Sequence, residues 1–163
     1  MKAETLRVML HYSPESGKWT WLQCGHSRFN GRRADHPRDK KRSYRIVTIE
    51  KTKYYAHRLA WLYMTGEWPV SDLDHRDLDK SNNIWSNLRL ATDQLNNANK
   101  KPKIRALPKG VDRRSDSIHR PYQARIKYNN KSIHLGQFST PEEAGRAYRR
   151  AAKRYFGEFA RTQ

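Results

Sequence analysis

Residues 72–92 read DLDHRDLDKSNNIWSNLRLAT, and the fold of the central part of the chain depends on what this stretch does. It is rich in Asp and Asn, contains one His, and has only a thin apolar framework. Such a composition is typical of a solvated loop. Helix candidates nevertheless flank it on both sides, AHRLAWLYMTGEWP at 56–69 and DQLNNANK at 93–100. The stretch therefore turns the chain, holds a metal ion or carries catalytic groups.

A calcium-binding loop is one hypothesis, because Asp72 and Asp74 have the alternate spacing with which an EF-hand begins. That loop needs a third oxygen ligand two residues on, then a Gly, and a Glu at its twelfth position. Arg76, Asp77 and Asn83 stand at these positions, so the sequence excludes an EF-hand.

Two other hypotheses remain for the same stretch. Asp and Asn side chains form turns by hydrogen bonding to the backbone, which accounts well for residues 77–82. It accounts less well for an Asp-His pair at the end of a strand. The alternative is a nuclease site, in which oxygen ligands hold Mg²⁺ or Mn²⁺ and a His activates water at neutral pH.

The charge of the chain points to a polyanionic partner. Lys and Arg total 34 against 16 Asp and Glu, a net charge of +18. Residues 1–96 carry 17 basic and 11 acidic side chains, whereas the remainder carries 17 basic and 5 acidic ones. Nucleic acid is the first candidate, and an acidic membrane surface is the second. No basic amphipathic helix with an apolar face stands alone, so we expect no membrane partner.

Composition and the N-terminal sequence narrow the class of protein. Cys24 is the single cysteine, which excludes an internal disulfide and a cysteine-rich zinc site, and we expect an incidental or structural thiol. The first residues lack the apolar core of a signal peptide, and no apolar run approaches transmembrane length. We therefore expect a soluble, intracellular protein with small cores rich in aromatic residues.

The N-terminal part of the chain shows short alternating and helical patterns. A helix is predicted over residues 5–10, a strand over 18–22 and a polar, basic loop over 25–42. A β-hairpin is predicted over residues 43–58, with its turn near 50–53.

The pattern changes after a basic, proline-bounded linker at residues 100–108. YQARIKY at 122–128 alternates strictly and predicts a strand, which continues through a turn into SIHLG, where Gly136 marks a bulge. STPEE then predicts the start of a helix, which ends at Gly157. The sequence thus predicts a three-stranded antiparallel sheet packed on one helix.

One face of this predicted sheet carries Arg125 and Lys127, with His134 beside them if the hairpin pairs in that register. A β-sheet can lie in the major groove of DNA and present alternate side chains to bases and phosphates. The alternative is a solvated polar face without a partner.

The segment from 44 to 100 closely resembles the HNH endonucleases of phages and mobile introns. The most specific parts are the Asp-His pair, the loop with Lys80 and Asn83, the sequence NLRLAT and an Asn-rich helix. The resemblance implies a ββα-metal fold, in which a β-hairpin and the following helix hold one divalent cation, Mg²⁺ or Mn²⁺.

By this resemblance, His75 is the general base that deprotonates the attacking water, and Asp74 is a metal ligand. Asn87 is the central Asn of the motif, which ties the loop together and orients the base. Asn96 supplies the second metal ligand from the helix, with Asn99 in reserve because it lies on a neighbouring side of the same face. The chain has Asn where the namesake motif has its last His, as in the His-Asn-Asn branch.

Three further residues belong to this region. Arg89 has two interpretations, a contact to the scissile phosphate or a solvated ion pair. His57 and Arg58 fit the AHRLAW pattern of the family, and we expect them to pack against the metal motif.

Residues 109–160 resemble the Apetala/ethylene-response-factor DNA-binding domain, which recurs in phage HNH proteins. The GV start, the LGxF strand end and the EEAxxAYxxAAxxxFG helix carry the resemblance. By this resemblance, the sheet contacts DNA through Lys109, Arg114, Arg125, Lys127 and His134. Asp112 replaces a usual contacting Arg and His134 a usual Trp, so the sequence preference of the plant proteins is not carried over.

Together these observations predict an α+β protein with a nuclease module at 1–99, a basic linker at 100–108 and a DNA-binding domain at 109–163. The predicted function is metal-dependent cleavage of double-stranded DNA, of homing or free-standing phage type. We expect a monomer or weak dimer in the cytoplasm, of a host cell if the protein is phage-encoded. A non-catalytic DNA-binding regulator and an RNA nuclease are the alternatives. The intact Asp-His pair and Asn87 favour the nuclease.

Overall fold

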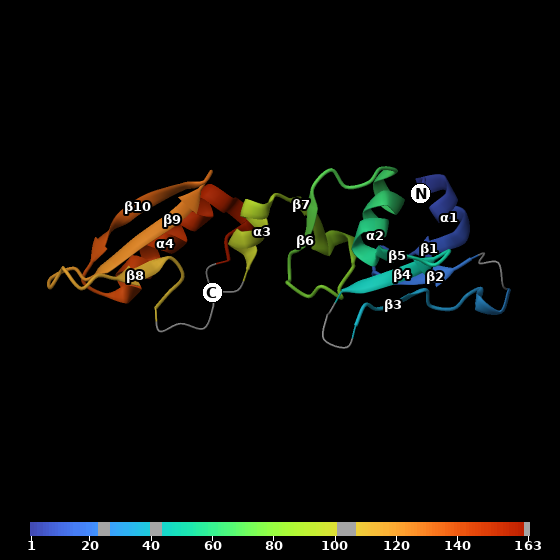
Figure 1. Ribbon diagram of the computed structural model, residues 1–163, viewed down its shortest axis with the longest axis horizontal. Coiled ribbons are helices and arrows are strands. Elements are labelled where there is room, and N and C mark those ends of the chain that lie inside the picture. Colours follow the sequence, from blue (N-terminus) through green and yellow to red (C-terminus); the bar gives the residue numbers. More distant parts are fainter. Residues whose placement is uncertain (23–26, 40–43, 101–106, 162–163) are drawn as a thin grey trace. The chain divides into compact units, whose positions relative to one another are not determined.

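The computed structural model describes residues 1–22, 27–39, 44–100 and 107–161 (Figure 1). Cys24 and most of the predicted linker lie outside these ranges. The chain divides into two compact units, unit 1 at Met1–Ala91 and unit 2 at Thr92–Gln163, and each is described by itself. No helix within the described ranges has the length and apolar character needed to span a membrane.

Unit 1 combines two helices with short strands. Its elements are α1 (Ala3–Met9), β1 (Leu10–Tyr12), β2 (Trp19–Trp21), the 3₁₀ turn η1 (Ser27–Phe29), β3 (Asp35–Pro37), β4 (Arg45–Ile49), β5 (Thr52–Tyr55), α2 (Ala56–Thr65), β6 (Asp72–His75), the 3₁₀ turn η2 (Trp85–Asn87) and β7 (Leu88–Ala91). In its described part, the strands form three antiparallel sheets, β1-β2, β3-β4-β5 and β6-β7.

The core of unit 1 lies between α1, α2 and the first two sheets. Its largest fully buried side chains are Trp19, Tyr12, Leu6, Leu10, Leu59, Leu62 and Val47. Helix α2 contributes the apolar face that its sequence predicts and ends at Gly66, whose φ of +85° suits glycine. The Gly66 N–H donates to the carbonyl of Leu62 at 2.9 Å and closes the last turn.

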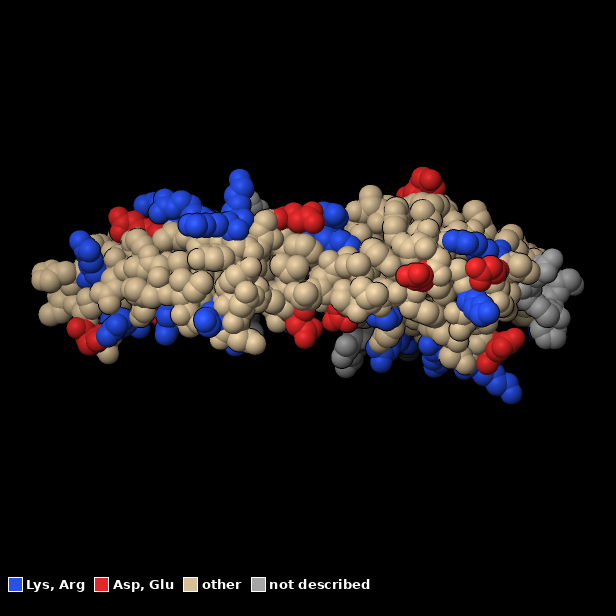
Figure 2. All heavy atoms as spheres, turned by 90° about the horizontal axis from the view of Figure 1, so that it is seen from above, with Lys and Arg blue, Asp and Glu red and all other residues tan. Residues whose placement is uncertain are grey.

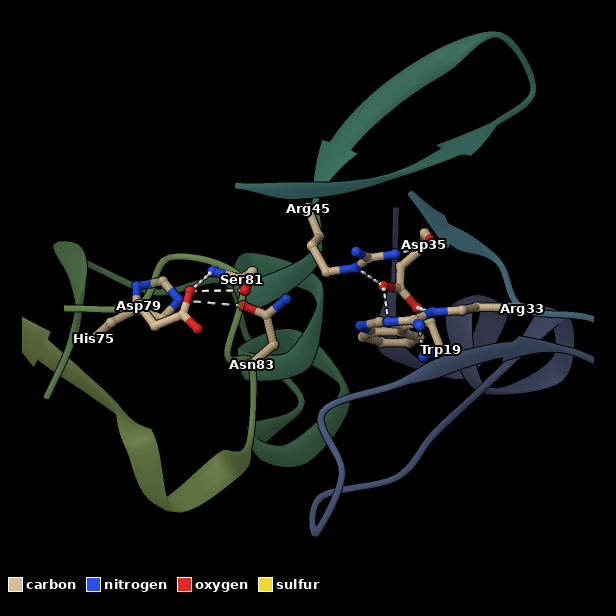
Figure 3. A network of polar contacts seen from close by, with 8 residues as sticks. All are labelled: Trp19, Arg33, Asp35, Arg45, His75, Asp79, Ser81 and Asn83. Atoms are coloured by element: carbon tan, nitrogen blue, oxygen red, sulfur yellow. Dashed lines mark hydrogen bonds and ion pairs between the residues drawn. The ribbon is translucent and has the colours of Figure 1, made fainter. Parts of the chain in front are cut away.

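The prediction of a loop over residues 25–42 is wrong for residues 35–37, which form strand β3. This strand pairs with β4, where Asp35 lies opposite Val47. Asp35 is buried in this strand and accepts hydrogen bonds from Arg33 and Arg45 and from the backbone N–H of Trp19 (Figure 3). Burial opposes ionisation of Asp35, but the bonds from Arg33 and Arg45 outweigh it and hold its pKa below the usual value. Because β3 is stabilised by a buried ion pair, its sequence lacks the apolar alternation from which a strand is predicted.

Unit 2 is a sheet covered on one face by a helix. Its elements are α3 (Asp93–Asn99), β8 (Val111–Arg113), β9 (Tyr122–Tyr128), β10 (Lys131–Phe138), α4 (Pro141–Phe156) and the 3₁₀ turn η3 (Gly157–Phe159). The strands lie in the order β10-β9-β8 and are antiparallel. The register shifts between His134 and Gly136, which confirms the predicted bulge. Val111 and Ala124 of the sheet pack against Ala144 and Ala147 of α4.

Both ends of α4 follow from local chemistry. The Thr140 hydroxyl accepts from the N–H of Glu143, Pro141 opens the first turn, and Gly157 ends the helix with a positive φ. The mixture of helices with small antiparallel sheets confirms the predicted α+β class, including the three-stranded sheet on one helix.

Candidate active site

The hairpin of β6 and β7 carries the central Asp-His pair. Asp74 lies opposite Arg89 and His75 lies opposite Leu88 in the antiparallel register. Leu73 and Leu88 are buried and anchor the hairpin to the unit. Since successive side chains of a strand point to opposite faces, Asp74 and His75 make different contacts.

Asp74 forms an ion pair with its cross-strand neighbour Arg89. The Arg89 Nε and Nη2 lie 3.0 Å and 2.8 Å from one carboxylate oxygen, Oδ2. Only 10% of the Asp74 side chain and 7% of the Arg89 side chain are exposed. Of the two interpretations of Arg89, the structure contains the ion pair, and it is nearly buried rather than solvated. The pair holds the Asp74 carboxylate in one orientation.

The imidazole of His75 lies in a closed environment. Only 4% of His75 and 1% of Asn83 are exposed, and Nε2 of His75 lies 3.2 Å from Oδ1 of Asn83 (Figure 3). Because an amide oxygen only accepts, Nε2 carries the proton and the lone pair is on Nδ1. Burial lowers the pKa of His75, although the bond to Asn83 and the nearby Asp77 oppose the shift. His75 is therefore neutral at pH 7, the form that a general base requires.

Aromatic rings and a second histidine surround His75. The ring centroid of His57, on α2, lies 5.2 Å from that of His75, and the Tyr44 ring lies 6.1 Å from His75. Burial, with smaller electrostatic contributions from His75 and Arg58, lowers the pKa of His57 to about 3. The Nζ of Lys80 lies 4.7 Å from the centre of the Tyr44 ring. The expected packing of His57 against the central motif is present, whereas Tyr44 was not predicted.

Asn87 closes the loop between β6 and β7. Its Oδ1 accepts from the N–H of Asp77 at 3.1 Å, and its Nδ2 donates to Oδ1 of Asp77 at 2.9 Å and to the carbonyl of Asn82 at 2.8 Å. Within the loop, Asp77 and Asp79 accept backbone N–H groups two residues on, from Asp79 and Ser81. The Asp and Asn side chains of this loop thus form turns, as one of the two hypotheses predicts. The candidate catalytic residues, Asp74 and His75, lie at the end of the strand before the loop.

The N-terminal segment supports this loop from behind, a role that the sequence patterns did not indicate. The hydroxyl of Tyr12 donates to the carbonyl of Asn83 at 2.5 Å, and the N–H of Trp85 donates to the carbonyl of Pro14 at 2.9 Å. Gly17 approaches so closely that a Cβ there would lie 2.4 Å from the carbonyl carbon of Asn83. The backbone on both sides of the Asn83 side chain is therefore fixed.

Asn96 and Asn99 lie on α3, in unit 2. Asn96 is half-buried and Asn99 is buried. The C-terminal end of α3 is held within unit 2, because Nζ of Lys109 donates to the carbonyls of Ala98 at 2.9 Å and Lys100 at 3.2 Å. Asp74 and His75, in contrast, lie in unit 1.

The five predicted DNA contacts of unit 2 divide into three groups. Arg125 and His134 are directly opposite on β9 and β10, and Lys127 shares their outer face. Arg114, beyond the end of β8, pairs with Asp116. The ammonium of Lys109 instead donates to carbonyls at the end of α3. Three of the five predicted residues, Arg125, Lys127 and His134, therefore lie together on the outer face of the sheet.

The outer sheet face also contains polar pairs. Nη2 of Arg125 lies 2.9 Å from Oδ2 of Asp112, and Nε2 of Gln123 lies 2.8 Å from Nδ1 of His134. Asp112, which replaces a usual contacting Arg, thereby neutralises a predicted DNA contact in the free protein.

The donor chemistry around the Asp-His pair fits a hard cation. Among the described residues, no three His, Cys, Asp or Glu side chains form a metal-binding group. The proposed donors, Asp74 with Asn96 or Asn99, are oxygen atoms with a single carboxylate. Mg²⁺ and Mn²⁺ accept such sets, because they keep several waters and take further oxygen ligands from substrate phosphates.

Comparison with known proteins finds similarity over the central segment. The family model for the HNH endonuclease matches residues 54–98, from β5 to α3. A protein described as an uncharacterized HNH endonuclease of Acanthamoeba polyphaga mimivirus is 37% identical over 117 residues, 70% of this chain. The aligned region is 59% of that relative, so the chain spans less than two thirds of its length.

Proposed function

We propose that this chain, which carries an HNH endonuclease domain at residues 54–98, is a metal-dependent endonuclease that hydrolyses phosphodiester bonds in double-stranded DNA. We further propose the homing or free-standing phage type, with unit 2 positioning the nuclease on DNA. The observation that carries the proposal is a buried, neutral His75 held by Asn83 next to the Asp74–Arg89 ion pair.

His75 is the general base. Its lone pair on Nδ1 accepts the proton of the water that attacks the phosphorus atom, and burial keeps the imidazole neutral and ready for this step. Asn83 fixes the tautomer because its Oδ1 accepts a hydrogen bond from Nε2–H, and the rings of His57 and Tyr44 restrict the rotation of His75. Asn87 acts as a positioning residue, because it closes the loop that carries Asn83.

Asp74, with Asn96 or Asn99, would hold one Mg²⁺ or Mn²⁺ ion. When bound, such an ion stabilises the negative charge that develops on the phosphate oxygens. Arg89 orients the Asp74 carboxylate through its two hydrogen bonds to Oδ2. A single carboxylate makes a weak site by itself, so we expect tight metal binding only in the presence of DNA.

Unit 2 would position the nuclease on the duplex and resembles the Apetala/ethylene-response-factor DNA-binding domain. Residues 92–163 carry 17 basic and 6 acidic side chains, net +11, compared with +7 for residues 1–91. Arg125, Lys127 and His134 form the outer face of a sheet, which suits the major groove. Their contacts with bases and phosphates would set where the hairpin of unit 1 cuts.

Incubation of supercoiled plasmid with the purified chain tests this function. We expect nicked or linear product with Mg²⁺ or Mn²⁺ and none with EDTA. DNA binding without cleavage under all metal conditions would favour the non-catalytic regulator, and cleavage of RNA in place of DNA would favour the RNA nuclease.

A further inference from the structure

The outer face of α4 is strongly basic. Its five cationic side chains are all exposed, and they are Arg146, Arg149, Arg150, Lys153 and Arg154. The acidic residues of this helix, Glu142 and Glu143, are confined to its first turn, where they suit the helix dipole. The last three turns therefore carry positive charge only, and we call the five cations the α4 basic face.

The α4 basic face points away from the sheet. The opposite side of the helix is buried against the sheet through Ala144, Ala147 and Tyr148, among others. The sheet in turn exposes Arg125 and Lys127 on its other side. Unit 2 thus has two basic surfaces on opposite sides, and Figure 2 shows Lys and Arg gathered along both long edges of this part of the chain.

The two surfaces differ in how their charges are compensated. Arg125 at the sheet face pairs with Asp112, and Arg114 nearby pairs with Asp116. No ion pair or hydrogen bond between described residues involves a side-chain nitrogen of the α4 basic face. Binding a phosphate there breaks no existing ion pair, so each contact keeps its full electrostatic gain.

A hollow beside the first turns of α4 adjoins this face. It has a volume of about 470 Å³ and is lined by Arg120, Gln137, Phe138, Ser139, Glu143, Arg146 and Arg150. Its lining contains three guanidinium groups and one carboxylate. Guanidinium groups bind phosphate oxygens in pairs of parallel hydrogen bonds, which suits a nucleic-acid backbone.

We propose that the α4 basic face is a second binding surface for the phosphate backbone of duplex DNA. Unit 2 then holds one duplex on its sheet and a second one on its helix. The inference rests on the proposed function in taking DNA as the polyanion and the sheet as one DNA-binding surface. A duplex that lies along the sheet cannot reach the opposite side of the unit without wrapping around it, so the second surface binds another segment. Arg and Lys contacts to phosphates do not distinguish sequences, so this binding is independent of sequence.

Holding two segments at once gives the protein a way to move between them. The sheet can release one segment while α4 still holds the other, so the nuclease searches DNA without returning to solution. Contacts of this kind weaken as salt rises, because each phosphate contact releases condensed counterions.

Sedimentation of the full chain with excess short duplex, in low salt and EDTA, tests the proposal. We expect a complex of one protein with two duplexes. The variant with all five cations of the α4 basic face changed to Gln should form only a one-to-one complex. Its salt dependence should fall by up to about 4.5 in log–log slope, roughly 0.9 for each lost phosphate contact. Gln is a good helix former, so α4 should stay folded, as thermal unfolding will show.

Two controls make the result specific. Changing Lys2, Lys18, Arg32, Lys51 and Lys53 of unit 1 to Gln removes five exposed cations elsewhere and should leave the one-to-two complex intact. Changing the four arginines of the α4 basic face to Lys keeps the charge and should also preserve it.

A wild-type complex limited to one duplex, a Gln variant that still binds two, or a second duplex found only in complexes with two proteins would each overturn the proposal. EDTA prevents metal-dependent cleavage in this experiment, so the stoichiometry is read separately from the nuclease assay.

Discussion

His75 and Asn83 face each other across the loop between β6 and η2, with Nε2 of the His 3.2 Å from Oδ1 of the Asn. Both side chains are almost fully buried. The backbone of Asn83 is in turn held by the hydroxyl of Tyr12 and lies against Gly17. An element from the start of the chain therefore controls the orientation of the candidate base.

Replacing Asn83 with Ala should lower the rate of DNA cleavage by about 10- to 100-fold, the usual effect of removing a partner that orients a functional side chain. His75 would lose the acceptor that fixes its tautomer, while the phosphate contacts of unit 2 stay intact. Single-turnover cleavage and DNA affinity should be measured together. An unchanged cleavage rate would show that Asn83 does not orient the base.

Replacing Gly17 with Ala should destabilise the protein by about 2–4 kcal/mol. Its φ of +67° costs about 1–2 kcal/mol for an L-residue, and the new methyl group meets the backbone of Asn83 and Ile84. Gly31 has a similar φ of +77° but no atom within 4 Å of a Cβ, so Gly31→Ala isolates the conformational cost. Equal losses in urea unfolding for the two variants would contradict the close approach.

The stability of the protein should fall as the pH drops below 6.5. Burial lowers the pKa of His57 to about 3, so the folded protein keeps this side chain neutral while the unfolded chain takes up a proton near 6.5. Its contribution is complete above pH 6.5 and is lost at up to about 1.4 kcal/mol per pH unit toward pH 3.

His57→Phe provides the matched comparison for this pH dependence. Its unfolding free energy should change less steeply than that of the wild type between pH 6.5 and 4.5, above the range where carboxylates dominate. Parallel curves for the two proteins would mean that His57 takes up its proton in the folded state.

Lys109 and Lys127 should behave differently although the domain resemblance gives both as DNA contacts. Lys109→Ala should cost about 1.5–3 kcal/mol in stability, because its ammonium binds two carbonyls at the end of α3. Lys127→Ala should leave stability unchanged and reduce the salt dependence of DNA binding by about 0.9 in slope. Urea unfolding and salt titration of both variants measure the two effects. A reduced salt slope for Lys109→Ala with unchanged stability would support Lys109 as a DNA contact and contradict its role at the end of α3.

Periodic patterns predicted much of the fold. The alternation of YQARIKY and the capping residues of α4 act locally, so the sheet and helix of unit 2 follow from them. Gly66 and the apolar face of α2 predicted that helix in the same way. Strand β3 could not be predicted, because Asp35 is stabilised by ion pairs with Arg33 and Arg45 and not by packing of an alternating apolar face. A buried ion pair leaves no periodic signal.

Only those residues of the candidate site that belong to a sequence motif could be predicted. Spacing and the family resemblance single out the Asp-His pair and Asn87. The contact between His75 and Asn83, and the support from Tyr12 and Gly17, depend on packing between distant segments. No single residue type or spacing in the sequence predicts such contacts. The contact of the Lys109 ammonium with the end of α3 could likewise not be predicted, because a surface Lys and a helix-capping Lys look identical in sequence.

The most direct test of the central claim is cleavage of supercoiled plasmid by His75→Ala and wild type, at equal concentration and with Mg²⁺ or Mn²⁺. The account predicts that the variant loses at least about 100-fold in single-turnover rate, the contribution of a general base, while its DNA affinity in EDTA and its unfolding midpoint stay close to wild type. Cleavage by His75→Ala at the wild-type rate would contradict the assignment of the base and with it the proposed mechanism.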